Sequence, residues 1–201
     1  YSMFALQDAQ DVAILPQELV QEFHKRGLKG RLEVFADRGR FTQSRLVGKH
    51  NAANAEAAFL AAREFGVSEE DAAAAVAAFV PLRHRLEFAG ELNGVTYVND
   101  SKCTTVDSLR AALESFDRPV VLMAGGKFKG GDLSALRDLL KKKVRKVVLF
   151  GASREIFTPA WEGAAPITWH ERMEPAFAEA RLTAQHGDVV LLSPATSSYD
   201  L

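Results

Sequence analysis

Four short apolar segments, separated by stretches with apolar residues at helical spacing, dominate the second part of this chain. Residues 120–123, 147–150 and 189–192 are continuously apolar, and residues 94–98 form an alternating run. Continuously apolar strands are typical of parallel sheets that carry helices on both faces. The pattern therefore predicts a doubly wound α/β domain, in which ligands bind at the carboxyl ends of the strands.

The first part of the chain has a less regular pattern, which ends near residues 81–85 (Pro-Leu-Arg-His-Arg), where we expect a domain boundary. Gly27 and Gly66 stop two helical patterns, and Ser68 with Asp71 three residues later is a typical helix start. We expect strands at residues 11–15, 32–35 and 41–47, and helices at residues 17–26, 51–64 and 69–79.

At 201 residues, with 47% hydrophobic and 25% charged residues, the chain is long enough for one large domain or two small ones. A net charge of −1 gives no general attraction to nucleic acid or anionic lipid. The single cysteine excludes an internal disulfide framework and fits a reducing compartment. No apolar run approaches the roughly 18 residues that span a bilayer, and we find no secretory signal. We therefore expect a cytoplasmic part of a longer protein, with neither nucleic acid nor membrane as partner.

A polar turn at residues 99–105 follows the strand expected at residues 94–98. A helix is expected beyond it, with Thr104 or Thr105 as N-cap. Free backbone N–H groups at such a helix start favour anions, and Lys102 adds a mobile cation. The alternative is a capped turn whose lysine is merely solvated.

A glycine-rich loop at residues 125–132 follows the strand expected at residues 120–123 and contains Lys127 and Lys129. Glycines let backbone amides approach an anion, and lysines supply positive charge. The loop matches neither the P-loop pattern Gly-x-x-x-x-Gly-Lys-Ser/Thr nor the dinucleotide fingerprint Gly-x-Gly-x-x-Gly, so a flexible, solvated turn is the alternative. We interpret residues 151–153, after the next strand, as a close-packing turn.

Hydroxyl side chains crowd into a third polar turn, at residues 193–200, after the strand expected at residues 189–192. The carboxyl ends of parallel strands meet at one edge of a sheet. Three turns suited to anions at one such edge favour a shared anion-binding site over coincidence.

Other candidate residues are less specific. Arg85 is suited to a phosphate, and a salt bridge at the domain boundary explains it equally well. Asn51 is expected to cap its helix, which leaves Asn54 without a structural explanation. The sequence has no group of His, Cys, Asp and Glu with zinc-like spacing. Cys103 has no histidine partner that would make it a nucleophile.

Five segments taken together resemble the Mur ligase family, which consists of ATP-dependent, amide-bond-forming enzymes of peptidoglycan precursor synthesis. The most specific are Asn-Asp-Ser-Lys-Cys-Thr at residues 99–104 and Ser-Pro-Ala-x-x-Ser-x-Asp at residues 193–200. These two resemble the family members that add D-glutamate to UDP-N-acetylmuramoyl-L-alanine. The resemblance covers about residues 48–201. The five segments, in family order, are residues 48–54, 84–87, 99–104, 125–130 and 192–200.

The resemblance implies a Rossmann-like C-terminal domain at residues 83–201, which binds the amino acid. At residues 1–82 it implies the remainder of a central ATP-binding domain. It also implies roles for individual residues. Lys102 would be catalytic, near the phosphates and the incoming amino acid. For ATP, Asn54 would bind the adenine, Arg85 the phosphates and Asp100 the ribose. The carboxylates of D-glutamate would be held by Thr104, Lys129, Ser198 and the Tyr199 backbone.

The activity implied by the resemblance converts a carboxylate to an acyl phosphate, from which the amine of D-glutamate displaces phosphate. ATP and Mg2+ would be required, in a monomeric enzyme whose main metal ligands lie outside this chain. In the family a carbamoylated lysine that helps to hold magnesium precedes a segment like residues 3–6, and residues 1–6 contain no lysine. The family's P-loop is also absent from these 201 residues, so we expect the chain alone to be inactive.

Two other functions are retained. A folylpolyglutamate synthase is a related ligase that adds L-glutamate to folate, although the serine-rich motif at residues 193–200 argues against it. A nucleotide- or anion-binding module that catalyses no reaction belongs to a different class of protein. If the 201 residues are the natural full length, the absence of a P-loop from them favours that module.

Overall fold

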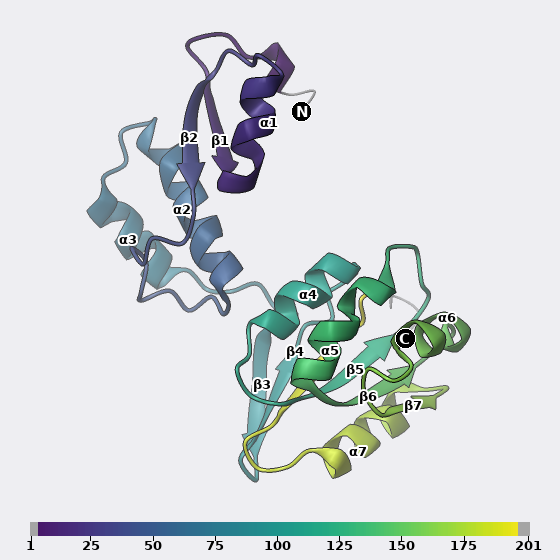
Figure 1. The fold of residues 1–201 in the computed structure, drawn as a ribbon. Helices are drawn as coiled ribbons and strands as arrows, with labels where there is room; N and C mark the ends of the chain where they lie inside the picture. The colour runs from purple at the N-terminus through teal and green to yellow at the C-terminus, as the bar shows by residue number, and fades with distance from the viewer. Residues whose placement is uncertain (1–3, 197–201) are drawn as a thin grey trace. The chain divides into compact units, whose positions relative to one another are not determined.

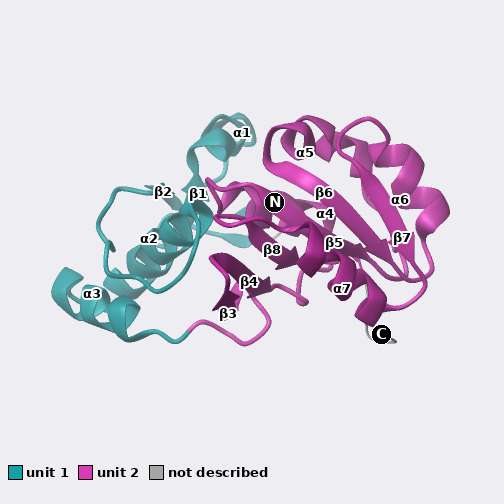
Figure 2. Cartoon of the chain, turned by 90° about the horizontal axis from the view of Figure 1, so that it is seen from below, with its two compact units in different colours: residues 1–80 teal, residues 81–201 magenta. Residues whose placement is uncertain are grey.

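The chain divides into two compact units, residues 1–80 and 81–201 (Figure 2). The computed structural model describes residues 4–196. The boundary expected from the sequence, between residues 82 and 83, lies close to this division. The assignment of the units to an ATP-binding and an amino-acid-binding domain stays a prediction, and each unit is described by itself.

The first unit contains a two-stranded parallel sheet and helices (Figure 1). Its elements, in chain order, are η1 (Phe4–Leu6), β1 (Val12–Pro16), η2 (Gln17–Leu19), α1 (Val20–Lys25), β2 (Arg31–Phe35), α2 (Lys49–Arg63) and α3 (Glu69–Ala78). Ala13, Leu15 and Phe23 are at most 3% exposed and form a core between β1 and α1. The helix predicted at residues 17–26 is therefore a 3-10 turn followed by a short α-helix.

The strand predicted at residues 41–47 is wrong, because the structure has irregular chain and a turn there. Phe41 is 8% exposed, and its ring packs against Phe59 of α2 with the centroids 5.9 Å apart. Arg40 pairs with the buried Glu56 of the same helix, with Nε and Oε2 3.1 Å apart. Contacts with a helix, and not pairing with a strand, therefore explain the apparent alternation.

Helix starts in the first unit were predicted correctly for α3 and incorrectly for α2. Ser68 caps α3 as expected, since its Oγ accepts from the backbone N of Asp71 at 3.0 Å. Helix α2 begins before Asn51, with Gly48 as its N-cap at a φ of 98°. The Asn51 side chain instead donates to the carbonyl oxygen of Val47 at 2.7 Å, so the prediction that Asn51 is the N-cap is wrong.

The second unit is built on a six-stranded sheet (Figure 1). Its elements, in chain order, are β3 (Glu87–Leu92), β4 (Val95–Asn99), α4 (Val106–Glu114), β5 (Val120–Gly125), η3 (Leu133–Leu136), α5 (Arg137–Lys143), β6 (Val144–Phe150), α6 (Arg154–Trp161), β7 (Ile167–His170), α7 (Met173–Thr183) and β8 (Val189–Leu192). The strand order is β3-β4-β8-β5-β6-β7, and every neighbouring pair is parallel except β3 with β4. This confirms the predicted α/β fold with a mostly parallel sheet.

Helices cover both faces of this sheet, as its continuously apolar strands require. Helices α4, α5 and α6 pack on one face, where Leu109, Leu140 and Trp161 are completely buried (Figure 1). Helix α7 packs on the other face through Ala176 and Ala180, which are also completely buried. Small residues let this helix approach the sheet closely.

Two strands of the second unit were missed by the sequence analysis. Strand β3 pairs with β4, and the turn that connects them contains Asn93 and Gly94, at φ values of 54° and 73°. Asn-Gly is the strongest short-range signal for a tight hairpin turn of this kind, so β3 was predictable. Strand β7 is as short as β8, at 4 residues each, but it is half-buried and reads Ile-Thr-Trp-His, so it lacks the continuous apolar run that identified β8.

Gly125 ends β5 where that strand lies against β6. A Cβ at this position would be 2.1 Å from the carbonyl oxygen of Phe150, and the φ of 129° is one that glycine adopts more readily than other residues. Gly130 has a similar φ of 116°, but a Cβ there would meet nothing within 4 Å. An alanine at either position would strain the backbone, but only an alanine at position 125 would also clash with a neighbouring strand.

We expect Gly125→Ala to lower the free energy of unfolding by about 2 kcal/mol or more beyond Gly130→Ala, because only the first change forces β5 and β6 apart. Urea unfolding followed by tryptophan fluorescence measures the difference, since the chain's 2 tryptophans, Trp161 and Trp169, both lie in this unit. Equal unfolding midpoints for the two variants would contradict the close approach.

Candidate functional site

The carboxyl ends of β4, β8 and β5 lie side by side, because these strands are adjacent in the sheet. The turns that follow them contain residues 99–105, 193–196 and 125–132. These are the turns that the sequence analysis considered suited to anions. The structure brings all of them to one edge of the sheet, which we call the carboxyl edge.

Hydrogen bonds join the turn after β4 to the turn after β8. The backbone N of Asp100 donates to the carbonyl oxygen of Leu192 at 2.8 Å, and Ser193 Oγ donates to Asp100 Oδ2 at 2.8 Å. Ser193 is completely buried, and Asp100 is 5% exposed. A buried hydroxyl paired with a buried carboxylate satisfies both groups and fixes the two strand ends relative to each other.

The glycine-rich loop after β5 is joined to the turn after β8 as well. The backbone N of Gly125 donates to the carbonyl oxygen of Pro194 at 3.1 Å. Thr196 Oγ1 donates to the carbonyl oxygen of Lys127, and Thr196 is only 1% exposed. The start of the loop is therefore held by buried contacts, and is not the freely solvated turn of the alternative interpretation.

The end of β6 holds the other side of the glycine-rich loop. The backbone N of Gly126 donates to the carbonyl oxygen of Phe150 at 3.0 Å. The backbone N of Phe128 donates to Ser153 Oγ at 2.8 Å, and Ser153 is 8% exposed. The sequence analysis gave residues 151–153 a packing role alone. The contact of Ser153 was not predicted, because it joins residues 25 positions apart and leaves no local pattern.

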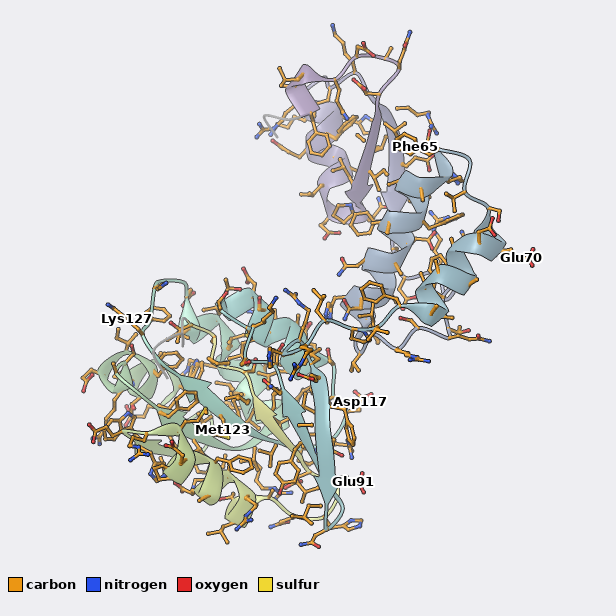
Figure 3. The ribbon with its side chains drawn as sticks, turned by 180° about the vertical axis from the view of Figure 1, so that it is seen from behind. Phe65, Glu70, Glu91, Asp117, Met123 and Lys127 are labelled. Carbon is orange, nitrogen blue, oxygen red and sulfur yellow. The ribbon has the colours of Figure 1, made fainter. Side chains whose placement is uncertain are left out.

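The lysines of the carboxyl edge are exposed. The side chains of Lys102, Lys127 and Lys129 form no hydrogen bond or ion pair with residues 4–196. Figure 3 shows Lys127 projecting away from the ribbon. Unpaired cations above a fixed backbone are suited to anionic ligands, because no internal partner has to be displaced.

Helix starts at the carboxyl edge contribute less to anion binding than the sequence suggested. Thr105 caps α4, since its Oγ1 accepts from the backbone N of Ser108 at 3.1 Å, and the exposed Thr104 is left out of the cap. Asp132 caps η3 by accepting from the backbone N of Ser134 at 3.0 Å. Hydrogen bonds with Ser134 lower the pKa of the Asp132 carboxyl. An anion at the start of η3 would meet this negative charge.

Asp100 has a structural role at the carboxyl edge. Burial raises the pKa of its carboxyl, against the hydrogen bonds that its oxygens accept from Ser193 and from the backbone N of Leu86. Arg85 is exposed, and no ion pair joins it to Asp100 or to any other residue within 4–196. The boundary salt bridge considered for Arg85 is therefore not formed among these residues.

The remaining predicted residues do not belong to the described part of the second unit. Asn54 belongs to the first unit, where it is exposed on α2 and its Nδ2 donates to Asn51 Oδ1 at 3.4 Å. Ser198 and Tyr199 lie outside the described residues. Among residues 4–196, no three His, Cys, Asp or Glu side chains are grouped so that they could hold a metal ion. In the same range, no helix is both long and apolar enough to cross a membrane.

A groove on the α7 face of the second unit is a poorer candidate. It lies beside β3, β4 and β8 and is lined by Leu92, Tyr97, Phe177 and Leu192, among others. Its lining is mainly apolar, whereas the pattern at the strand ends calls for charge and hydroxyl groups. The carboxyl edge is therefore the candidate functional site.

Comparison with protein families identifies the class of protein that has this fold and this edge. Residues 84–196 match the family described as Mur ligase, glutamate ligase domain. Since the match covers more than half of the sequence, the chain belongs to the Mur ligase family.

Curated relatives give a more particular similarity. The UDP-N-acetylmuramoylalanine--D-glutamate ligase of Desulfovibrio desulfuricans is 56% identical over 201 residues, which are 100% of this chain and 46% of that ligase. The ligase of the same name from Lawsonia intracellularis is 54% identical over 190 residues, which are 94% of this chain and 43% of that ligase. The chain thus spans slightly less than half the length of these relatives.

Solved structures share the fold at low sequence identity. MurF ligase from Thermotoga maritima, crystallised in complex with ADP, has a TM-score of 0.67 at 15% identity, over 96% of this chain and 52% of that chain. Folylpolyglutamate synthase from Mycobacterium tuberculosis, complexed with ADP and AMPPCP, has a TM-score of 0.67 at 17% identity, over 92% of this chain and 53% of that chain. Identities this low establish the fold alone.

The reactivity of the Cys103 thiol, in the turn after β4, reports how well the carboxyl edge excludes solvent from this side chain. The residue is 2% exposed, and burial raises the pKa of its thiol from 9.0 to about 11. At pH 8 roughly one thiol in a thousand is then ionised in the folded chain, and the thiolate is the reactive form. We expect DTNB to label Cys103 about 100-fold or more slower in buffer than in denaturing urea. Ala178→Cys in a Cys103→Ser background, exposed on α7, is the fast-labelling control.

The same shift has a consequence for stability at alkaline pH. Below pH 9.0 the thiol is protonated in both the folded and the unfolded chain, whereas between pH 9.0 and about 11 only the unfolded thiol ionises. The free energy of unfolding should therefore fall as the pH rises through this window, and Cys103→Ser should remove that part of the fall. Rapid labelling of the folded chain at pH 8 would contradict the burial of Cys103.

We expect Thr196→Val to lower the free energy of unfolding by about 1–3 kcal/mol, because the carbonyl of Lys127 loses its hydrogen bond from the buried Thr196 hydroxyl. Thr196→Ser keeps the hydroxyl and removes one methyl group, so it should cost about 1 kcal/mol or less. Thermal unfolding of the two variants measures the difference. Equal losses would mean that the hydrogen bond to the glycine-rich loop contributes nothing to stability.

Proposed function

We propose that this chain is part of an ATP-dependent ligase that joins D-glutamate to UDP-N-acetylmuramoyl-L-alanine in peptidoglycan precursor synthesis. The observation that carries the proposal is the 56% identity, along the whole chain, to a ligase whose name states both partners. The alternative of a binding module that catalyses no reaction has no comparable support.

In this reaction the carboxylate of UDP-N-acetylmuramoyl-L-alanine becomes an acyl phosphate, and ATP supplies the phosphoryl group. The amine of D-glutamate then forms the amide bond as phosphate leaves. The task of the carboxyl edge is to bind and orient D-glutamate so that its amine, and not water, meets the activated carbonyl carbon.

We assign the carboxylates of D-glutamate to the carboxyl edge of the second unit. Their two negative charges must be neutralised before a second acidic substrate can approach. Lys129 offers a cation and Thr104 a hydroxyl group, and both side chains are exposed and unpaired within residues 4–196. Ser198 and the Tyr199 backbone, which follow the described residues, complete the proposed set. The anchored backbone of the glycine-rich loop supports this assignment because it fixes the point from which Lys129 extends.

We assign the phosphates of ATP to Arg85 and Lys102, with Lys102 also next to the incoming amino acid. Both side chains are exposed cations, which suits them to phosphate oxygens. Asp100 is assigned to the ribose. Each of its oxygens already accepts a hydrogen bond, but a carboxylate has further lone pairs that can accept from a ribose hydroxyl. Asn54, in the first unit, is assigned to the adenine.

Mg2+ would neutralise part of the phosphate charge during transfer. Residues 4–196 contain no cluster of carboxylate and imidazole side chains that would hold it. We therefore assign its main ligands to parts of the complete enzyme outside this chain. In the same proposal, residues 83–201 form the amino-acid-binding domain and residues 1–82 the remainder of the ATP-binding domain, in a monomeric, cytoplasmic enzyme.

The fold does not separate this proposal from a folylpolyglutamate synthase, because MurF ligase and that synthase have equal TM-scores of 0.67. The sequence favours the D-glutamate ligase. Identity is 56% to the Desulfovibrio desulfuricans ligase and 17% to the folylpolyglutamate synthase structure.

In the complete enzyme we expect Lys129→Ala to raise the KM for D-glutamate at least about tenfold and the KM for ATP less than about twofold. A charge-assisted contact with a carboxylate contributes roughly 1.5–3 kcal/mol, which corresponds to such a change. Steady-state phosphate release at varied D-glutamate and ATP measures both constants. Lys142→Ala, which removes an exposed lysine near the end of α5, is the matched control.

Equal effects of Lys129→Ala on the two KM values would refute the carboxylate role of this lysine. An equal effect of Lys142→Ala would mean that general surface charge, and not the glycine-rich loop, attracts D-glutamate. Phosphate release from the 201-residue chain alone, dependent on both substrates, would contradict the proposal that it is only part of the enzyme.

A further inference from the structure

A backbone outlier marks the turn that carries Arg85. His84 has a φ of 66° and Leu86 a φ of 45°, in the left-handed region that residues with a side chain rarely adopt. Among the described residues, the other non-glycine positions with positive φ are Asn93, in the hairpin turn, and Ala195. Strained residues of this kind cost roughly 1–3 kcal/mol each and persist only where the surrounding structure holds them.

Contacts with the end of β4 and the start of β3 hold His84 in this conformation. Its backbone N donates to Glu87 Oε2 at 2.7 Å. Nδ2 of Asn99 lies 3.0 Å from His84 Nδ1, and the amide nitrogen is the donor of that pair. The carbonyl oxygen of His84 accepts from the backbone N of Lys102 at 3.0 Å. Backbone and ring of His84 are thus both bound to the segment that carries Lys102.

Leu86 is held from the other side of Arg85. Its backbone N donates to Asp100 Oδ1 at 3.1 Å, and its side chain packs against the hydrophobic core of the second unit. Arg85, between these two fixed residues, is exposed and forms no hydrogen bond or ion pair within residues 4–196, although its charge acts on the nearby Asp100 carboxylate. The strained backbone of the turn therefore surrounds an exposed guanidinium group that forms no hydrogen bond or ion pair among the described residues.

We propose that Glu87 and Asn99 are positioning residues, which hold the strained turn so that Arg85 and Lys102 act on the same phosphate chain. This inference rests on the proposed function, in which both cations bind the phosphates of ATP. His84 provides the physical link, because Glu87 and Asn99 fix it and it accepts the backbone hydrogen bond of Lys102. Because the backbone segments that carry the two cations are already fixed relative to each other, phosphate binding has to order only their side chains.

A purely structural role for Glu87 leads to different expectations. Pairing of β3 with β4 uses only its backbone, which every substitution retains. Its ion pair with Arg83 has Nε and Oε1 3.9 Å apart, and the Arg83 side chain is 83% exposed, so the pair contributes little. Glu87→Gln removes that charge but keeps an oxygen that can accept from His84 N. The glutamine variant therefore separates the hydrogen bond from the charge.

In the complete enzyme we expect Glu87→Ala to raise the KM for ATP about tenfold and to leave the KM for D-glutamate within about twofold. Glu87→Gln should return the KM for ATP to within about threefold of the wild-type value. Glu91→Ala is the matched control and should change neither constant. Glu91 is an exposed glutamate near the far end of β3, and its side chain points away from the unit (Figure 3).

Two further variants keep the test decisive if Glu87→Ala fails to fold. Asn99→Ala removes the hydrogen bond to the His84 ring and should raise the KM for ATP in the same way. In an Arg85→Ala background, Asn99→Ala should raise the KM for ATP by a smaller factor than it does in the wild-type enzyme, because one of the two cations that it helps to position is already absent.

The outcomes separate this inference from the proposed function. If Arg85→Ala leaves the KM for ATP unchanged, the ATP-binding role of this turn is wrong, and the inference fails with it. If Arg85→Ala raises that KM while Glu87→Ala and Asn99→Ala do not, the proposed function stands and the positioning role is overturned. The positioning role is also overturned if the effect of Asn99→Ala on the KM for ATP adds in full to that of Arg85→Ala. The same holds if Glu87→Gln raises this KM as much as Glu87→Ala does.

Discussion

One buried carboxylate is the contact on which the carboxyl edge depends. Asp100 accepts a hydrogen bond from Ser193, 93 residues away along the chain, and another from the backbone of Leu86, 14 residues away. Burial raises the pKa of the carboxyl, which means that the charged form is held there at a cost in free energy. The two donors offset that cost. Loss of the carboxylate would leave both of them without their partner and release the turn before β3 from the end of β8.

The carboxyl edge combines a fixed backbone with free side chains. The turns after β4, β8 and β5 are tied to one another by hydrogen bonds, two of which come from the buried hydroxyls of Ser193 and Thr196. The charged ends of Arg85, Lys102 and Lys129, in contrast, form no hydrogen bond or ion pair within residues 4–196. Cations on a fixed backbone are preorganised for anions, and binding then costs less conformational entropy. This arrangement agrees with the function proposed above, in which the second unit binds a dicarboxylate and phosphates.

Much of the fold was predictable because the relevant patterns are local. Burial on both faces leaves no polar alternation, so residues 120–123, 147–150 and 189–192 predicted parallel strands correctly. The errors fell on segments whose conformation depends on distant partners. Residues 41–47 alternate in polarity, yet Phe41 packs on a helix. Strand β7 is short and is stabilised by its pairing with β6, which no local pattern reveals. The Asn-Gly turn before β4 was a signal that the sequence analysis overlooked.

The sequence by itself determined which residues gather at strand ends and that the strands are parallel and covered by helices, since both follow from the spacing of apolar and polar residues. Only the tertiary structure decided which turns meet. Strand β8 is last in the chain but lies between β4 and β5, so Ser193 reaches Asp100 and Thr196 reaches the glycine-rich loop. It also decided that Ser153, Thr196 and Asn99 hold the backbone of the site. A hydrogen bond to a residue far along the chain leaves no trace in local periodicity, because strand order is fixed by packing of the whole sheet.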